Sequence, residues 1–107
     1  MYSFSLENKY NKVITVIEYE EEYVLNNLYE KDIPFIKTIW ERYYDDYTFS
    51  IEELKNAKHD LMKYMELDSW QNLSDEVTKN QLKFIYKLIA IVFYALENNC
   101  SLYGSGD

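Results

Sequence analysis

Carboxylates and phenols gather at two places in the first half of the chain, and these side chains have the greatest capacity for chemistry. In the first cluster two tyrosines flank three consecutive glutamates (residues 19–23), and in the second three tyrosines surround two aspartates (residues 43–47). Carboxylates at this density can hold metal ions, act as general acids and bases, or attract a cationic surface. The neighbouring residues decide among these possibilities.

The residue types do not favour a metal centre or a catalytic site. Sites for soft metals need clustered cysteine and histidine, and the chain has one of each, Cys100 and His59. Calcium loops need a glycine at the turn among alternating acids, but both glycines lie at positions 104 and 106, far from the acidic clusters. His59 falls on the outer face of its predicted helix, and no basic residue lies close to Cys100 in the sequence to activate its thiol. We expect no catalytic residue, no metal and no cofactor.

The charge pattern favours binding instead. Residues 1–53 contain twelve acidic and five basic side chains, so they hold nearly all of the net charge of −8. Such a surface repels nucleic acid and attracts basic partners. Tyrosine adds a large contact area at little cost in conformational entropy. The residues predicted to bind a partner are Glu20, Glu22, Tyr23, Glu41, Tyr44, Asp45, Asp46 and Tyr47.

The second cluster works against the helix that we expect to carry it. Glu41 and Asp45 are like charges four residues apart on one predicted helix face, and Asp45 and Asp46 fall near the helix C-terminus, where the backbone dipole prefers cations. Such conflicts are enriched at functional sites. Tyr44 and Tyr47 are expected to point away from the core. The alternative interpretation is that the acids serve solubility and the tyrosines serve packing.

The elements that position these residues suggest an α+β, predominantly helical fold. Apolar residues alternate with a period of two over residues 2–6 and 13–19, with an asparagine-containing loop between them, which predicts an N-terminal β-hairpin. Residues 20–29 could continue the sheet, but their spacing favours a helix. We expect a single layered domain over residues 1–107, in which the hairpin packs on three to four helices.

Three further helices follow from start signals. Asp32 and Pro34 suit a helix beginning, with Asp32 as the capping acid. Ser50 and Glu53 match a capping box. The last helix is predicted to begin at Ser74 and to end near residues 98 and 99. One side of it is predicted to carry an inward-facing stripe, formed by Val77, Gln81, Phe84, Ile85, Leu88, Val92 and Ala95. We expect residues 101–107 to form a flexible tail, or else a short strand against the hairpin.

Lysines recur every fourth residue along the last predicted helix, at Lys79, Lys83 and Lys87. They can form a solvated rim that includes an Asp75–Lys79 pair. They can also face the acidic half of the same molecule and partly neutralise it. Either interpretation is favoured over RNA binding, because a domain with this net charge releases few counterions on meeting phosphate.

Composition also bears on the cellular compartment. A single cysteine excludes an internal disulfide and suits a reducing environment. Residues 1–12 do not have the pattern of a secretory signal. The longest uninterrupted apolar run, residues 88–96, is much shorter than the roughly 20 residues of a membrane span. We expect a cytoplasmic protein with no membrane contact.

These observations together predict a non-catalytic acidic protein that neutralises a basic protein partner, above all an immunity protein or antitoxin that inhibits a nuclease-type bacterial toxin. In size and composition the chain resembles immunity proteins and DNA-mimic inhibitors as classes, although no motif identifies one family. One alternative is a DNA-mimic inhibitor of a nucleic-acid enzyme. Another is an oligomerising scaffold that uses an apolar face around Trp40 or Trp70. On the first interpretation the chain is a monomer before it binds its partner, with no direct nucleic-acid binding.

Overall fold

The computed structural model describes residues 2–66 and 75–106. These residues form an α+β domain with more helix than strand, which confirms the predicted fold class. In chain order the elements are β1 (Ser3–Glu7), β2 (Lys12–Val16), α1 (Tyr19–Tyr29), α2 (Pro34–Glu41), β3 (Asp46–Phe49), α3 (Ile51–Met65), α4 (Glu76–Glu97) and β4 (Ser101–Ser105).

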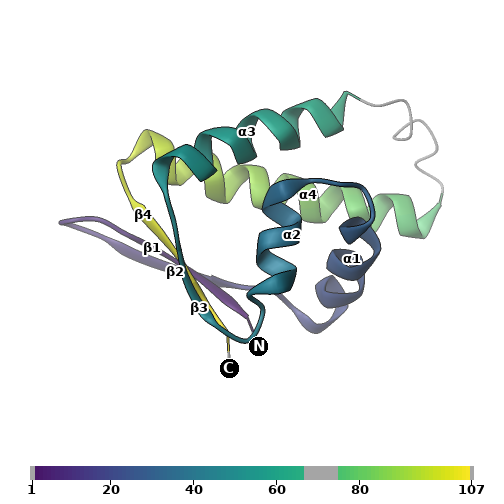
Figure 1. Ribbon diagram of the computed structural model, residues 1–107, viewed down its shortest axis with the longest axis horizontal. Helices are drawn as coiled ribbons and strands as arrows, with labels where there is room; N and C mark the ends of the chain where they lie inside the picture. Colours follow the sequence, from purple (N-terminus) through teal and green to yellow (C-terminus); the bar gives the residue numbers. More distant parts are fainter. Residues whose placement is uncertain (1, 67–74, 107) are drawn as a thin grey trace.

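The strands form one antiparallel sheet in the order β2-β1-β4-β3. The N-terminal hairpin is confirmed as β1 and β2, with Leu6 opposite Val13. β4 pairs with β1 on one side and with β3 on the other, so it occupies a central position. The prediction of a flexible tail is therefore wrong for residues 101–105, and the strand alternative is the one that the structure shows. This pairing brings the two chain ends close together (Figure 1).

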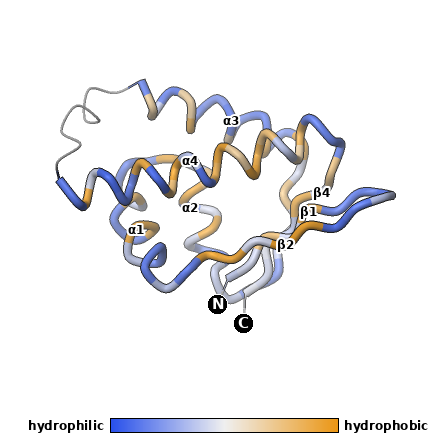
Figure 2. The backbone as a smooth tube through the Cα atoms, turned by 180° about the vertical axis from the view of Figure 1, so that it is seen from behind, coloured by the Kyte–Doolittle hydropathy of each residue, from blue (hydrophilic) through white to orange (hydrophobic). Residues whose placement is uncertain are grey.

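One face of the sheet carries the core. Tyr2, Phe4 and Leu6 are buried, whereas the alternate residues Ser3 and Ser5 are only partly covered. The four helices lie on one side of the sheet (Figure 1). Figure 2 shows hydrophobic residues recurring along α4 and along β1, whereas the tip of the hairpin is hydrophilic. Alternation along the strands therefore fixes which face the helices cover.

Helix α4 is the main helical contribution to this core. The predicted apolar stripe is confirmed in its central part, where Phe84, Ile85, Leu88 and Val92 are buried. Val77, in the first turn, is exposed instead. No helix within residues 2–66 and 75–106 is both long enough and apolar enough to cross a membrane.

Capping side chains lie at the starts of α3 and α4. The capping box of α3 is confirmed: Ser50 Oγ accepts from the Glu53 amide at 3.1 Å, and Glu53 Oε1 accepts from the Ser50 amide at 3.1 Å. At α4 the N-cap is Asp75, whose Oδ1 accepts from the Val77 amide at 3.2 Å. The predicted start at Ser74 lies outside the described residues. The predicted end of α4 is confirmed, since Asn98 is its C-cap.

The segment between residues 20 and 29 is helical, as favoured, and forms most of α1. Pro34 is the first residue of α2, which also agrees with the prediction. The assignment of Asp32 as the capping acid is wrong, because the N-cap is Ile33. Asp32 adopts a positive φ of 60° in the preceding turn, and its carboxylate pairs with Lys37 at 2.5 Å.

Helix α2 is shorter than the sequence predicted. It ends at Glu41, the chain turns over residues 42–45, and Asp46 begins β3. The prediction that Glu41 and Asp45 share a helix face is therefore wrong, as is the placement of Asp45 and Asp46 at a helix C-terminus. The chain leaves the helical conformation here because Asp46 pairs with Ser105 across the sheet.

Candidate functional site

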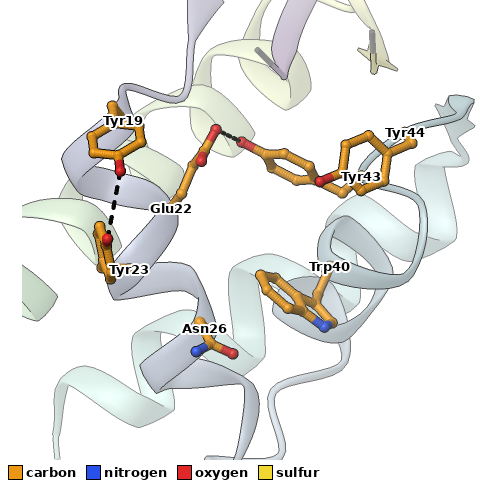
Figure 3. A pocket seen from close by; sticks show the side chains of 7 residues that line it. All are labelled: Tyr19, Glu22, Tyr23, Asn26, Trp40, Tyr43 and Tyr44. Carbon is orange, nitrogen blue, oxygen red and sulfur yellow. Dashed lines mark hydrogen bonds between the residues drawn. The ribbon is translucent and has the colours of Figure 1, made fainter.

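A groove lies on the surface between α1 and the end of α2. Its volume is about 390 Å³, and aromatic side chains dominate its walls (Figure 3). The residues that line it are Tyr19, Glu22, Tyr23 and Asn26 from α1, Trp40 from α2, and Tyr43 and Tyr44 from the turn that follows.

Helical periodicity explains why these α1 residues share the groove. The four of them are spaced i, i+3, i+4 and i+7, which places them on one helix face. The opposite face of α1 packs inward through Val24, Leu25 and Leu28. A short helix with one polar aromatic face and one aliphatic face is thus held by the core while it presents phenols and a carboxylate outward.

The second wall comes from the end of α2. Trp40 lies there with 38 % of its surface exposed, and Tyr44 lies in the following turn with 79 % exposed. Tyr43, between them, is buried and stacks on the ring of Tyr2 at 5.3 Å between centroids. Tyr43 therefore anchors the turn in the core, and its neighbours remain available to a ligand.

A hydrogen bond joins the two walls. The Tyr43 hydroxyl donates to Glu22 Oε1 at 2.5 Å, and Figure 3 shows the two side chains pointing toward each other. Burial, together with this bond, raises the pKa of Tyr43 well above its usual range, so the phenol stays protonated and remains a donor at neutral pH. The Glu22 carboxylate is consequently fixed at the side of the groove.

Tyr19 and Tyr23 form the outer edge of the α1 wall. Their rings meet edge to face, with centroids 5.8 Å apart and an interplanar angle of 85°. Their hydroxyl oxygens lie 3.5 Å apart, and this bond raises the pKa of Tyr19. Both rings are largely exposed, so they contribute contact area that the core does not use.

The C-terminal segment holds the turn that carries Tyr43 and Tyr44. The Gly106 amide donates to the Asp45 carbonyl at 3.1 Å, and Ser105 Oγ donates to Asp46 Oδ1 at 3.0 Å. A Cβ on Gly106 would lie 2.1 Å from the Tyr43 carbonyl oxygen, which no side chain tolerates. Residue 106 must therefore be glycine for the chain to pass this close to the groove.

The eight residues predicted to bind a partner do not form one continuous patch. Glu22, Tyr23 and Tyr44 line the groove. Glu41 is the last residue of α2 and Asp45 the last residue of the turn; both are exposed, and neither is among the residues that line the groove. Glu20 is exposed on α1, where it lines a different hollow, next to Val77 and Asn80 of α4. Asp46 is exposed at the start of β3, with its carboxylate bonded to Ser105.

Tyr47 differs from its prediction. Its side chain is only partly exposed and packs against the core, with its ring centroid 5.0 Å from that of Phe49. Its hydroxyl donates to Glu53 Oε2 at 2.7 Å, which raises the pKa of Tyr47. The expectation that it points away from the core is wrong, because residue 47 lies on the core-facing side of β3, opposite Gly104.

Sequence reasoning missed four of the residues that line the groove, namely Tyr19, Asn26, Trp40 and Tyr43. The signal was present in the i, i+3, i+4 spacing of polar and aromatic residues at 19, 22, 23 and 26, and again at 40, 43 and 44. The tyrosines of the predicted site were chosen because they are close to acidic residues in the sequence. That criterion does not detect the spacing. A search for non-aliphatic residues at this spacing would have found it.

The lysines of α4 were predicted either to form a solvated rim or to face the acidic half of the molecule, and each interpretation holds for some of them. Lys87 reaches the acidic half of the molecule, donating to Glu21 Oε1 at 2.8 Å and to the Val16 carbonyl at 2.6 Å. Lys83 is exposed. Lys79 pairs with Glu76 at 3.7 Å rather than with Asp75, whose carboxylate caps the helix. Only Glu21 of the three consecutive glutamates is thereby neutralised.

The remaining candidates for chemistry lie apart. His59 is exposed on α3, and Cys100 is buried. Within the described part of the chain, no three His, Cys, Asp or Glu side chains are grouped so that they could hold a metal ion.

Comparisons of the chain with protein-family models, with curated proteins and with solved structures find no match. The groove is therefore interpreted from its own geometry and charge.

Proposed function

We propose that this protein is a non-catalytic acidic binding protein that neutralises a basic protein partner, as an immunity protein or antitoxin neutralises a nuclease-type toxin. The observation that carries the proposal is the aromatic groove between α1 and α2, with Glu22 in its wall and the exposed acids Glu41 and Asp45 adjacent in sequence to its lining residues. On this proposal the protein acts in the cytoplasm, as a monomer until it meets its partner.

The net negative charge of the protein favours a basic partner for the groove. A nuclease must present a cationic surface to hold the phosphate backbone, so an inhibitor with carboxylates competes for the same positions. The net charge of −8 steers such a partner toward the molecule and speeds association at low salt. Exposed aromatic rings then slow dissociation, because they bury a large area at little cost in conformational entropy.

The DNA-mimic alternative is less well supported. An imitation of the phosphate backbone calls for carboxylates in a row along one strip. Here the predicted carboxylates are distributed over α1, the end of α2 and the start of β3, and the groove between α1 and α2 is mainly aromatic. This arrangement suits binding to a protein surface with projecting basic side chains better than it suits imitation of duplex DNA.

The scaffold alternative is tested by the mass of the free protein in solution. Of the two tryptophans that this alternative could use, Trp40 already lies in the groove with part of its surface covered, and Trp70 lies outside the described residues. Sedimentation at micromolar concentration is expected to show a monomer, and concentration-dependent dimers would favour the scaffold.

The test of the proposed function uses two double charge reversals with the same net charge. Glu41→Lys with Asp45→Lys alters the acids beside the groove, and Glu66→Lys with Glu97→Lys alters exposed acids at the ends of α3 and α4. Asp46 is left unchanged because its carboxylate holds Ser105.

Each protein is immobilised and used to capture partners from its source cell, followed by mass spectrometry and titration of the purified partner. We expect a basic protein that the unaltered chain and the control variant retain, that co-expression of this chain renders harmless, and that the groove variant binds about tenfold or more weakly at low salt. Equal capture by all three proteins would contradict the proposed site. Capture of only acidic or neutral proteins would contradict the function.

A further inference from the structure

The walls of the groove have the chemistry of a cation receptor. The exposed rings of Tyr19, Tyr23 and Tyr44 and the partly exposed ring of Trp40 surround it. A cation over the face of an aromatic ring is attracted by the quadrupole of the ring, most strongly over tryptophan. Among the residues that the structure describes, no lysine or arginine lines the groove, so these residues do not neutralise the negative potential of the ring faces.

Glu22 supplies the negative charge at a defined point. Oε1 already accepts the Tyr43 hydroxyl, and within the described residues Oε2 accepts no hydrogen bond. The side chain is only partly exposed, so a cation that reaches Oε2 is less screened by water than one at the exposed acids nearby. The bond to Tyr43 also fixes the direction in which Oε2 can accept.

The shape and the acceptors favour a guanidinium group over an ammonium. A planar guanidinium stacks on aromatic faces, is weakly hydrated and offers five donors in a rigid fork. Glu22 can take one donor, and Asn26, one helical turn further along α1 on the same face, has an amide oxygen for another. A lysine ammonium is more strongly hydrated and gains less from the same walls. At about 390 Å³ the groove lies at the small end of the range for ligand sites, which suits a single side chain.

We propose that the groove between α1 and α2 is a receptor for one arginine side chain of the partner, with its guanidinium between the aromatic walls and bonded to Glu22. The identity of the partner as a protein rests on the proposed function, whereas the affinity of the groove for a guanidinium does not. The exposed acids Glu41 and Asp45 then attract the basic surface around that arginine.

The test uses small probes in place of the unidentified partner. N-acetyl-arginine methylamide, its lysine counterpart and its trimethyl-lysine counterpart are titrated into the ¹⁵N-labelled chain, and the indole N–H signal of Trp40 is followed after assignment with Trp40→Phe. We expect a saturable shift with the arginine probe, with a dissociation constant on the order of 1 mM. The lysine probe is expected to bind more weakly.

Two variants with the same charge change separate the groove from general attraction. Glu22→Gln keeps an acceptor for Tyr43 but removes the charge. It is expected to weaken binding of the arginine probe about tenfold. Glu20→Gln changes a neighbouring exposed glutamate that does not line this groove, and its effect is expected to stay below about twofold. Circular dichroism checks that both variants are folded.

The arginine proposal fails if the Trp40 signal does not shift, if the two variants weaken binding equally, or if the trimethyl-lysine probe binds more tightly than the arginine probe. These outcomes are distinct from failure of the proposed function. A chain that captures a basic protein but not the arginine probe keeps its function and loses this receptor. A chain that binds the probe but captures no basic protein keeps the receptor and loses the function.

Discussion

Two core tyrosines, Tyr2 and Tyr43, stack on each other, but their hydroxyls differ in their surroundings. The Tyr43 hydroxyl donates to Glu22. The Tyr2 hydroxyl is buried with no partner in the described part of the chain, and it lies against Gly104, where an added Cβ would be 1.5 Å from the oxygen. One phenol thus supports the groove, and the other leaves a polar atom unsatisfied in the core.

Tyr2→Phe is therefore expected to leave stability unchanged or to raise it by about 1 kcal/mol, because an unsatisfied buried hydroxyl carries a desolvation penalty of that order or more. Urea unfolding at pH 7 measures the change. The matched control is Tyr43→Phe, which removes a satisfied hydroxyl and is expected to destabilise by about 1–2 kcal/mol. A loss of stability in Tyr2→Phe as large as that in the control would show that the Tyr2 hydroxyl has a partner.

The raised pKa values of Tyr2, Tyr43, Tyr47 and Tyr64 make stability depend on alkaline pH. A folded-state pKa above the unfolded value, which is about 10, stabilises the fold fully below pH 10, and this contribution is lost as the pH rises further. We expect the free energy of unfolding to fall above about pH 10, and to fall less steeply in Tyr43→Phe. Urea titrations between pH 7 and pH 11 test this, and equal slopes for the two proteins would contradict the assignment.

At the scale of elements, sequence reasoning succeeded where the signal is local. The capping box at Ser50, the start of α2 at Pro34 and the stripe of α4 depend on residues within a few positions of one another. It failed at the turn over residues 42–45, where apolar and aromatic spacing allows the helix to continue. What ends α2 is the pairing of β3 with β4, and that partner lies more than fifty residues away in sequence.

Lys87 joins three elements, because its ammonium bridges Glu21 of α1 and the last carbonyl of β2 from its place on α4. Lys87→Met is expected to destabilise the fold by about 1–3 kcal/mol, since both partners are hydrogen-bonded to a charged group that is mostly shielded from water. Lys83→Met, on the exposed side of the same helix, should stay within about 0.5 kcal/mol. Thermal and urea unfolding compare the two. Equal effects would mean that the bridge contributes nothing.

For the whole molecule, the sheet order was the part least accessible from sequence. The hairpin was predicted from local alternation, but residues 101–105 contain a glycine and serines that are typical of a tail, and only their long-range partners make them a central strand. The candidate site was also difficult to predict from the sequence, because it too depends on long-range contacts. Glu22, Tyr23 and Tyr44 were identified, yet the groove exists only because the core brings α1 against α2 and the C-terminal segment secures the turn after α2.

Ending the chain after Cys100 is therefore expected to unfold the domain rather than trim it, because β1 and β3 would both lose a strand partner and the buried Leu102 would be removed. Circular dichroism and the loss of a cooperative urea transition measure this. Tyr103→Thr is the control, since it changes an exposed side chain of the same strand and should stay folded. A truncated chain with a cooperative transition would show that β4 is dispensable.

The central position of β4 also bears on how the protein is made. During synthesis β1 leaves the ribosome first, but its neighbour at the centre of the sheet follows about one hundred residues later, with Ser3 finally opposite Ser105. Until then the nascent chain exposes Phe4 and Phe49 without the strand that lies between them. A domain with this strand order can complete its sheet only after its last strand has been synthesised, and until then its exposed apolar segments are prone to aggregation.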